Sequence, residues 1–289
     1  MDSAGLEKII SFRCDLTFAK ADLNLNMQSR PFSYLFSISY FGARYKGWAP
    51  QPNQPTVQKR LERVIRHVLG HEDFSLIGAS RTDSGVSCLG GFVQLFLREK
   101  AEMDKLLSEL NSHLPDDIRL NSVEEVPPTF NLIQAVSQKT YRYYFSSEAN
   151  LHPFASAFLV KISSPLNLEL MQEAAQLFEG SYNFKAFCKA SENKTDYTRE
   201  VLSAGIYASN EFLGTFFPKG IHYFEVTGTG FLHHQVRKMV TALWEVSNGN
   251  WKPADISKRL ENANSDWEQI PPAPANGLIL WKTILKSES

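Results

Sequence analysis

The chain has few cysteines, and they do not form paired motifs. Its three cysteines, Cys14, Cys88 and Cys188, lie far apart among 289 residues, and no C-x-x-C occurs. This pattern argues against a disulfide framework and against a zinc knuckle. It also excludes a zinc-dependent nucleobase deaminase, which needs a close pair of cysteine ligands. A chain so poor in cysteine is typical of a reducing compartment.

An excess of positive charge and long apolar runs are also absent. The 30 Lys and Arg residues are balanced by 31 Asp and Glu residues, giving a formal net charge of -1. A polyanionic partner must therefore be held by local patches. No apolar run approaches the ~20 residues of a membrane span. Residues 1–30 resemble neither a secretory signal nor a transit peptide. We expect a cytoplasmic protein with an N-terminal extension, 1–30, of uncertain order.

Short helical and extended patterns alternate along the rest of the chain. Strands are predicted at 32–40, 74–80, 91–97, 118–126, 138–145, 157–162, 198–207, 221–228 and 277–283. Helices are predicted at 57–69, 103–114, 168–178, 232–247 and 253–262. Such alternation favours an α+β fold with helices packed on a sheet. The two halves, 31–150 and 151–289, have similar element order, which suggests a duplicated fold on one continuous sheet with a cleft between them.

A single carboxylate lies in the loop between two predicted strands. The stretch 80–85, Ser-Arg-Thr-Asp-Ser-Gly, joins the apolar runs 74–79 and 92–97. Loops held by rigid strands often carry catalytic groups, which makes Asp83 a candidate. The neighbouring Arg81 offers a fork of donors suited to phosphate or a base edge. Taken alone, these residues favour an Asx-turn, in which Asp83 only bonds the following backbone.

Arg237 is the second candidate, because it leads an apolar stripe of the predicted helix 232–247. An arginine so placed is usually half-buried and paired, since burying it alone is costly. Its partner could be an acid that only fastens the helix. The other interpretation pairs Arg237 with Asp83 across the cleft, which would keep the carboxylate ionised and fix its direction. His233 and His234 could contact phosphate, but the pattern favours packing roles for both.

The segment Lys139-Thr-Tyr-Arg-Tyr-Tyr-Phe145 is an aromatic strand. Alternation puts Tyr141 on one face and Arg142 on the other. An aromatic strand with neighbouring cations can stack unpaired bases, although the pattern alone favours a strand that faces the core. The helix 57–69 carries a basic stripe that is either a solvated face or part of a contact surface. A polyanionic partner is expected to contact Arg44, Lys46, Arg60, Arg63, Lys139, Arg142 and Lys238.

Together these motifs resemble the TruA-type tRNA pseudouridine synthases, from about residue 32 to 285. The segments that carry the resemblance are 40–48, 56–58, 80–86, 140–143, 178–187, 230–239 and 276–280. It implies that Asp83 is the nucleophile and that Arg81 helps to turn the target nucleotide out of its stack. Tyr141 would stack on the uracil, and Arg237 would pair with the aspartate. Leu278 would line the uracil pocket.

The resemblance also implies the architecture and the partners. The expected fold has two ferredoxin-like halves that form a broad, mainly antiparallel sheet with helices packed on it and a central cleft. The expected substrate is tRNA, with uridines isomerised in the anticodon stem-loop by a homodimer that uses no metal or cofactor. The chain departs from the family pattern at 130–133, where Phe-Asn-Leu-Ile replaces the common Phe-His-Ala-Arg. This removes one possible RNA contact.

Two other functions fit parts of the pattern. A non-catalytic RNA-binding or chaperone protein on the same scaffold would use the cations but not Asp83. A hydrolase of nucleosides or glycosides would use Asp83 as nucleophile. Such a hydrolase usually needs a second carboxylate at a defined separation, and no candidate stands near Asp83 in the sequence.

Overall fold

The computed structural model describes residues 30–148, 150–162, 165–191, 194–212 and 214–286, so most of the predicted N-terminal extension lies outside the described residues. The strands are β1 (Phe32–Tyr40), β2 (Phe74–Gly78), β3 (Ser87–Leu97), β4 (Ile118–Val126), β5 (Val136–Ser146), β6 (Val160–Lys161), β7 (Gly180–Asn183), β8 (Thr198–Ala208), β9 (His222–Gly228) and β10 (Leu278–Leu285). The helices are α2 (Val57–Leu69), α3 (Met103–His113), α4 (Leu132–Ala135), α5 (Leu168–Gln176), α6 (Gln235–Ser247) and α7 (Pro253–Glu261).

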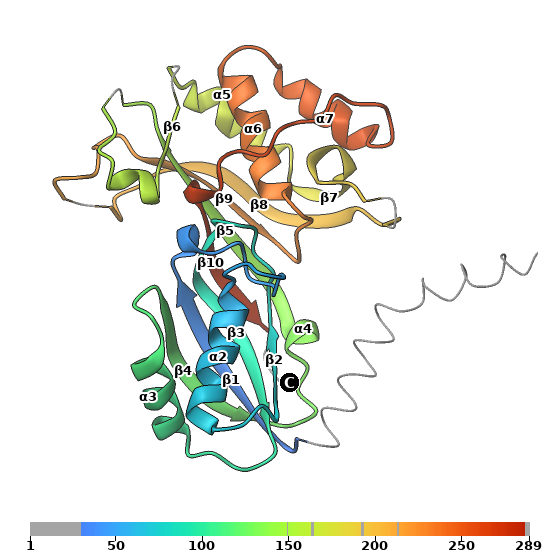
Figure 1. Ribbon diagram of the computed structural model, residues 1–289. Helices are drawn as coiled ribbons and strands as arrows, with labels where there is room; N and C mark the ends of the chain where they lie inside the picture. Colours follow the sequence, from blue (N-terminus) through green and yellow to red (C-terminus); the bar gives the residue numbers. More distant parts are fainter. Residues whose placement is uncertain (1–29, 149, 163–164, 192–193, 213, 287–289) are drawn as a thin grey trace, which may run out of the picture.

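All the strands belong to one sheet, and each half of it has the same arrangement (Figure 1). The first half runs β1-α2-β2-β3-α3-β4 along the chain and places its strands in the order β4-β1-β3-β2. Leaving out β6, β7 and α7, the second runs β5-α5-β8-β9-α6-β10 and gives the strand order β10-β5-β9-β8. Strand β7 is added at the edge, and the short β6 pairs with β5. Both are ferredoxin-like βαββαβ units. The predicted α+β fold and the continuous sheet are therefore confirmed.

The two halves join where β3 and β10 pair in parallel. Ile279 lies opposite Ser87 in this short ladder. Along its other edge β10 runs antiparallel to β5, with Leu280 opposite Tyr141. This seam brings the start of β3, which follows the Asp83 loop, close to β5. The strand pairing groups β5 with β9 and β10 of the second half. The sequence-based division at residue 150 placed β5 in the first half, and that division stays a prediction.

The longer helices pack on one face of the sheet. A single hydrophobic cluster contains Leu61 of α2, Leu110 of α3, Met171 of α5, Leu243 of α6 and Ile256 of α7, together with residues of the strands. A smaller cluster around Tyr144 and Ile279 includes loop residues and no residue of these helices. Within the described ranges, no helix is long and apolar enough to cross a membrane.

Most predicted elements are present with small shifts of their ends. The strand predicted at 157–162 shrinks to the two residues of β6. Neither β7 nor α4 was predicted, because β7 has the composition of a turn and α4 has only four residues. The helix predicted from residue 232 begins at Gln235, since His234 takes a left-handed backbone conformation that a helix cannot continue.

Gly42 provides a test of how closely the segments of the first half are packed around the Asp83 loop. Its amide donates to the Ser87 hydroxyl over 3.0 Å, and a Cβ atom at this position would overlap the Val86 carbonyl. We expect Gly42→Ala to lower the free energy of unfolding by about 1–3 kcal/mol through overpacking. Urea denaturation measures the loss. Gly230→Ala is the control, because its Cβ would meet nothing within 4 Å; equal stability of the two variants would contradict the close packing.

Candidate active site

Strands β2 and β3 hold the loop 79–86 at the seam, and the backbone of a preceding segment fastens it. The Trp48 amide donates to the Thr82 carbonyl over 3.1 Å, and the Gly85 amide donates to the Tyr45 carbonyl over 3.1 Å. Both bonds flank the acid in the chain. The backbone that presents Asp83 is therefore fixed from both sides.

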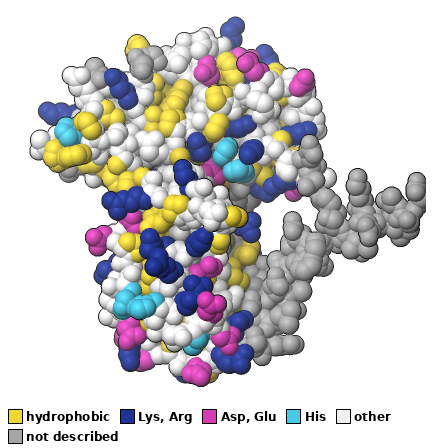
Figure 2. All heavy atoms as spheres, viewed as in Figure 1, with side chains coloured by type: hydrophobic (Ala, Val, Ile, Leu, Met, Phe, Trp, Pro, Cys, Tyr) yellow, Lys and Arg dark blue, Asp and Glu magenta, His cyan; other side chains and the backbone are white. Residues whose placement is uncertain are grey.

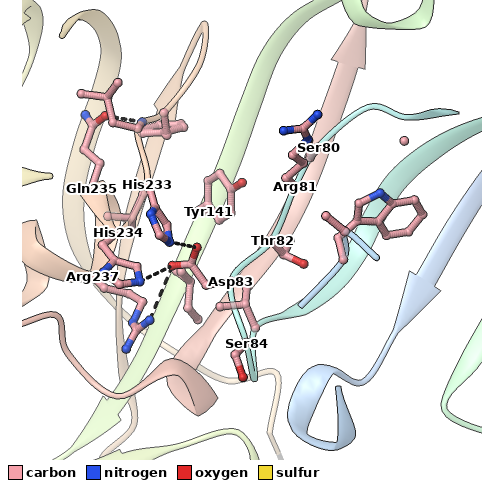
Figure 3. Close-up of a pocket in the computed structure, with 18 of the residues that line it drawn as sticks. Ser80, Arg81, Thr82, Asp83, Ser84, Tyr141, His233, His234, Gln235 and Arg237 are labelled. Carbon is pink, nitrogen blue, oxygen red and sulfur yellow. Dashed lines mark hydrogen bonds and ion pairs between the residues drawn. The ribbon is translucent and has the colours of Figure 1, made fainter. Parts of the chain in front are cut away.

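The Asp83 carboxylate points toward three nitrogen groups from the start of α6 and the turn before it (Figure 3). Its Oδ2 lies 3.5 Å from Nη1 of Arg237 and 3.7 Å from Nε2 of His234. Its Oδ1 lies 3.4 Å from Nε2 of His233. Among the described residues, no backbone amide donates to this carboxylate, so the Asx-turn interpretation is wrong. The acid is 17% exposed and turned toward the Arg237 guanidinium and two imidazoles.

Arg237 is held by more than its acid. Its Nε donates to the Ala273 carbonyl over 2.6 Å, and the Ala273 amide donates back to the Arg237 carbonyl over 3.1 Å. One turn later, the Thr241 hydroxyl donates to the Pro271 carbonyl over 2.8 Å. The loop before β10 thus fastens the guanidinium, which is 13% exposed. The pairing of Arg237 with Asp83 expected across the cleft is present.

The two histidines do not pack into the core, so the packing roles predicted for them are wrong. His233 is 53% exposed and His234 is 22% exposed at the side chain. His234 has a φ angle of 63°, and the ring centroids of the pair lie 4.0 Å apart. A non-glycine residue in this conformation is uncommon and is often found at functional sites. Periodicity could not reveal it, because the conformation of a single residue leaves no repeating signal.

These groups line a cleft of about 1070 Å³ between the two halves. Figure 2 shows Lys and Arg side chains gathered around the waist of the molecule and over α2. The cations that line the cleft are Lys46, Arg81, Lys139, Lys194 and Arg237. Of its described lining residues, Asp83 is the one carboxylate. A glycosidase-like pair of acids is therefore missing from the cleft as described.

The other predicted site residues line the same cleft. Tyr141 is 8% exposed and packs edge-to-face on Phe231, with ring centroids 5.3 Å apart. Burial raises the pKa of Tyr141 well above its ordinary value, and the charges of Cys88 and Asp83 act in the same direction. Leu278 is 5% exposed at the start of β10, and Arg81 is exposed. The fold brings all five residues together; their roles stay predictions.

Of the seven cations expected to contact RNA, Lys46 and Lys139 line this cleft, and two of the others are engaged within the protein. Arg142 projects from the other face of β5, with its guanidinium 4.5 Å from the ring centroid of Tyr223 and 4.0 Å from that of Trp281. Its Nε donates to Glu225 over 2.6 Å. Lys238 is 4% exposed, and its Nζ donates to a backbone carbonyl over 2.7 Å. Both expectations are wrong because each side chain is already engaged within the protein.

Asp83, His233 and His234 could also be considered as metal ligands. Their ligand atoms lie within 4.8 Å of one another. Two imidazoles and a carboxylate form a donor set that zinc accepts. The Arg237 guanidinium, however, lies against the same carboxylate and would repel a dication. The cluster therefore fits a metal poorly, and we assign none.

Comparison with known proteins identifies relatives along most of the chain. The family model described as tRNA pseudouridine synthase matches residues 37–133 and 174–284. A tRNA pseudouridine synthase A 2 of Bacillus cereus is 36% identical over 230 residues, which are 79% of this chain and 90% of that protein. The tRNA pseudouridine synthase A of a Bacillus species is 34% identical over 249 residues, 86% and 97% of the two chains. The family match includes Asp83 and Arg237.

The environment of His234 generates a pH prediction. Burial lowers the pKa of His234 below its ordinary 6.5, while the Asp83 charge acts in the opposite direction. Between that lowered pKa and 6.5, the unfolded chain binds a proton here that the folded chain does not. The free energy of unfolding should therefore fall as the pH decreases through this range.

His234→Asn should reduce this fall, since asparagine tolerates a positive φ and does not titrate. Urea unfolding of both proteins above and below pH 6.5 measures the difference. An NMR titration that places the pKa of His234 at or above 6.5 would contradict the prediction.

Proposed function

The chain belongs to the tRNA pseudouridine synthase family, and from this premise we propose that it isomerises uridine to pseudouridine in tRNA. The observation that carries the proposal is the lone carboxylate of the cleft, aligned by Arg237 and surrounded by cations. A polyanionic substrate is attracted to such a cleft even though the whole chain has a net charge of -1.

The reaction suits a site with a single acid. The N1–C1′ bond of uridine breaks, a C5–C1′ bond forms, the hydrogen on C5 leaves and N1 gains one. No group is lost and nothing is oxidised. We assign Asp83 as the nucleophile that attacks the nucleotide, at C1′ of the ribose or at C6 of the ring; the alternative is that it removes a ribose proton as a base. Each of these steps needs an ionised and directed carboxylate, which the contact with Arg237 supports.

The walls of the cleft suit a detached uracil. We propose that the Tyr141 ring stacks on the base and that Leu278 closes the apolar side of the pocket. The Tyr141 hydroxyl is protonated at neutral pH, as in any tyrosine, and burial raises its pKa further. Arg81 is exposed at the cleft, where it can enter the space that the nucleotide leaves. Turning a base out of its stack costs a few kcal/mol, which such a contact offsets.

Cations on both sides of Asp83 support an extended RNA contact. A second hollow of about 530 Å³ runs along α2 and is lined by Lys59, Arg63 and Arg66 together with Glu62; Arg66 also pairs with Glu72. Gln51 lines both this hollow and the cleft. On the other half, Lys194 lines the cleft. We propose that an anticodon stem-loop lies along this path, with its target uridine at Asp83.

We further propose that the protein is a cytoplasmic homodimer. Exposed aromatic side chains, including Phe154 at 66% and Phe216 at 44%, offer apolar surface that a second copy would cover. Their rings lie 5.0 Å apart, so they form one patch rather than scattered residues. Exposed apolar patches of this kind often mark association sites.

Replacing the acid tests the reaction directly. Asp83→Asn keeps the shape of the side chain and removes the nucleophile, so activity should fall by about 10³-fold or more. The assay is tritium release from tRNA transcripts that carry uridine labelled at C5, because isomerisation breaks the C5–H bond. RNA binding should stay within a few-fold of wild type. Asp104→Asn, an exposed acid of α3, is the matched control. Activity of Asp83→Asn near the wild-type level would remove the assignment.

Salt dependence tests the RNA path. If Arg63 contacts a phosphate, Arg63→Gln should reduce the slope of log affinity against log salt by roughly 0.7–0.9. Filter binding of unmodified tRNA at several salt concentrations measures this slope. Arg98→Gln is the control, because Arg98 is similarly exposed but pairs with Asp73 outside both hollows. An unchanged slope for Arg63→Gln would contradict the path along α2.

A further inference from the structure

Ile133 is an unusual residue of the cleft. Among the described lining residues, it is the one large hydrophobic side chain that is exposed, at 57%. The same cleft is lined by the cations Arg81 and Lys139. It is also the last residue of the segment 130–133, where the family resemblance led us to expect arginine.

The turn that carries Ile133 is hydrogen-bonded to the buried side-chain amide of Gln94. Gln94 of β3 is fully buried, and its Nε2 donates to the Phe130 carbonyl over 2.9 Å and to the Ser33 hydroxyl over 2.8 Å. Its Oε1 accepts from the Leu132 amide over 3.2 Å. A buried amide is costly unless it is hydrogen-bonded, and this one uses its bonds chiefly to fix the turn. The backbone before Ile133 is therefore tied to β3.

Asn131 caps the N-terminus of the same short helix. Its side-chain oxygen accepts from the amides of Ile133, over 3.1 Å, and Gln134, over 3.2 Å. The Ala135 amide donates to the Asn131 carbonyl over 2.9 Å. The short helix α4 is thus stabilised by its N-cap residue Asn131 and by Gln94 of β3, and the side chain of Ile133 is exposed. The side chain is itself stiff, since isoleucine is branched at Cβ.

The packing of α4 connects the segment that carries Ile133 to the loop that carries Arg81. Leu132 is 1% exposed and belongs to one hydrophobic cluster with Ala79. Ala79 begins the loop that continues through Arg81, and α4 lies beside β2 in Figure 1. Both Ile133 and Arg81 line the cleft. A rigid apolar side chain and an exposed cation therefore line the same cleft as Asp83.

We propose that Ile133 is an apolar wedge that enters the RNA stack where the target uridine leaves it, and so helps to select stacked uridines. The inference rests on the proposed function. Proteins that kink or open nucleic acid often insert such a side chain between bases. Burying Ile133 between base faces would offset part of the cost of unstacking. Arg81 would contribute charge at the same place, where an apolar group cannot contact phosphate.

The test compares one stacked and one unstacked target. The first probe is an unmodified tRNA transcript whose modified uridine has been mapped. The second is the same transcript with an abasic site on the 3′ side of that uridine, which removes its stacking neighbour. For Ile133→Ala, we expect kcat on the first probe to fall by about 10-fold or more, and kcat on the second to change by less than about 3-fold. Ile133→Leu should retain most of the wild-type rate on both.

Ile284→Ala is the matched control, because Ile284 is 37% exposed and does not line the cleft. It should behave as wild type with both probes. An equal loss with both probes, or no loss for Ile133→Ala, would overturn the wedge and leave the proposed isomerisation standing. If Ile133→Ala instead dissociates an oligomer, seen as a smaller molecular mass in solution, and leaves both rates unchanged, the wedge would be overturned. Ile133 would then contact a second copy of the chain.

A binding measurement separates the wedge from the chemistry. With 2-aminopurine in place of the 3′ neighbour, wild type should increase its fluorescence on binding and Ile133→Ala should not. Asp83→Asn, which lacks the nucleophile, should still give the increase. Absence of tritium release by wild type would defeat the proposed function. Absence of the fluorescence change with wild type would defeat the wedge.

Discussion

The contact between Asp83 and Arg237 is the interaction on which the site depends. It joins residues 154 positions apart, one on the loop between β2 and β3 and the other on α6. The acid is mostly screened from water, so its charge needs neighbouring cations. Arg237 can serve it because the Ala273 carbonyl holds the other side of its guanidinium. Neither half of the sheet could form this arrangement alone.

Positive charge is concentrated around that contact, in the lining of the cleft. The chain has as many acids as bases, within one residue. Yet the described lining of the cleft has one acid and five Lys or Arg side chains. Segregation of charge into a concave surface concentrates its field there, without a large net charge that would oppose folding. This explains how a nearly neutral protein can attract a polyanion to one place.

Much of the fold could be predicted from sequence, because strand and helix periodicities are local. The site was reached through motif resemblance, since Asp83 alone suggested an Asx-turn. What failed depends on contacts between distant residues. The left-handed backbone conformation of His234 shifts the start of α6 to Gln235 and directs two imidazoles toward the acid. The hydrophobic periodicity of the sequence gives no sign of it. The helix α4 needs the amide of Gln94 from another strand. Arg142 does not face the cleft, because its guanidinium packs over the rings of Tyr223 and Trp281 on the other face of the sheet. The sequence does not show which residues lie beside it there.

The parallel pairing of β3 with the final strand, β10, has a consequence for biosynthesis. A ribosome releases the loop that carries the acid long before it releases the strand that completes the seam. Until then, the nascent chain has a first unit that can form its own four strands, β4-β1-β3-β2, without the guanidinium. The contact between Asp83 and Arg237 can therefore form only after the first unit, because the guanidinium lies on a helix that is synthesised later.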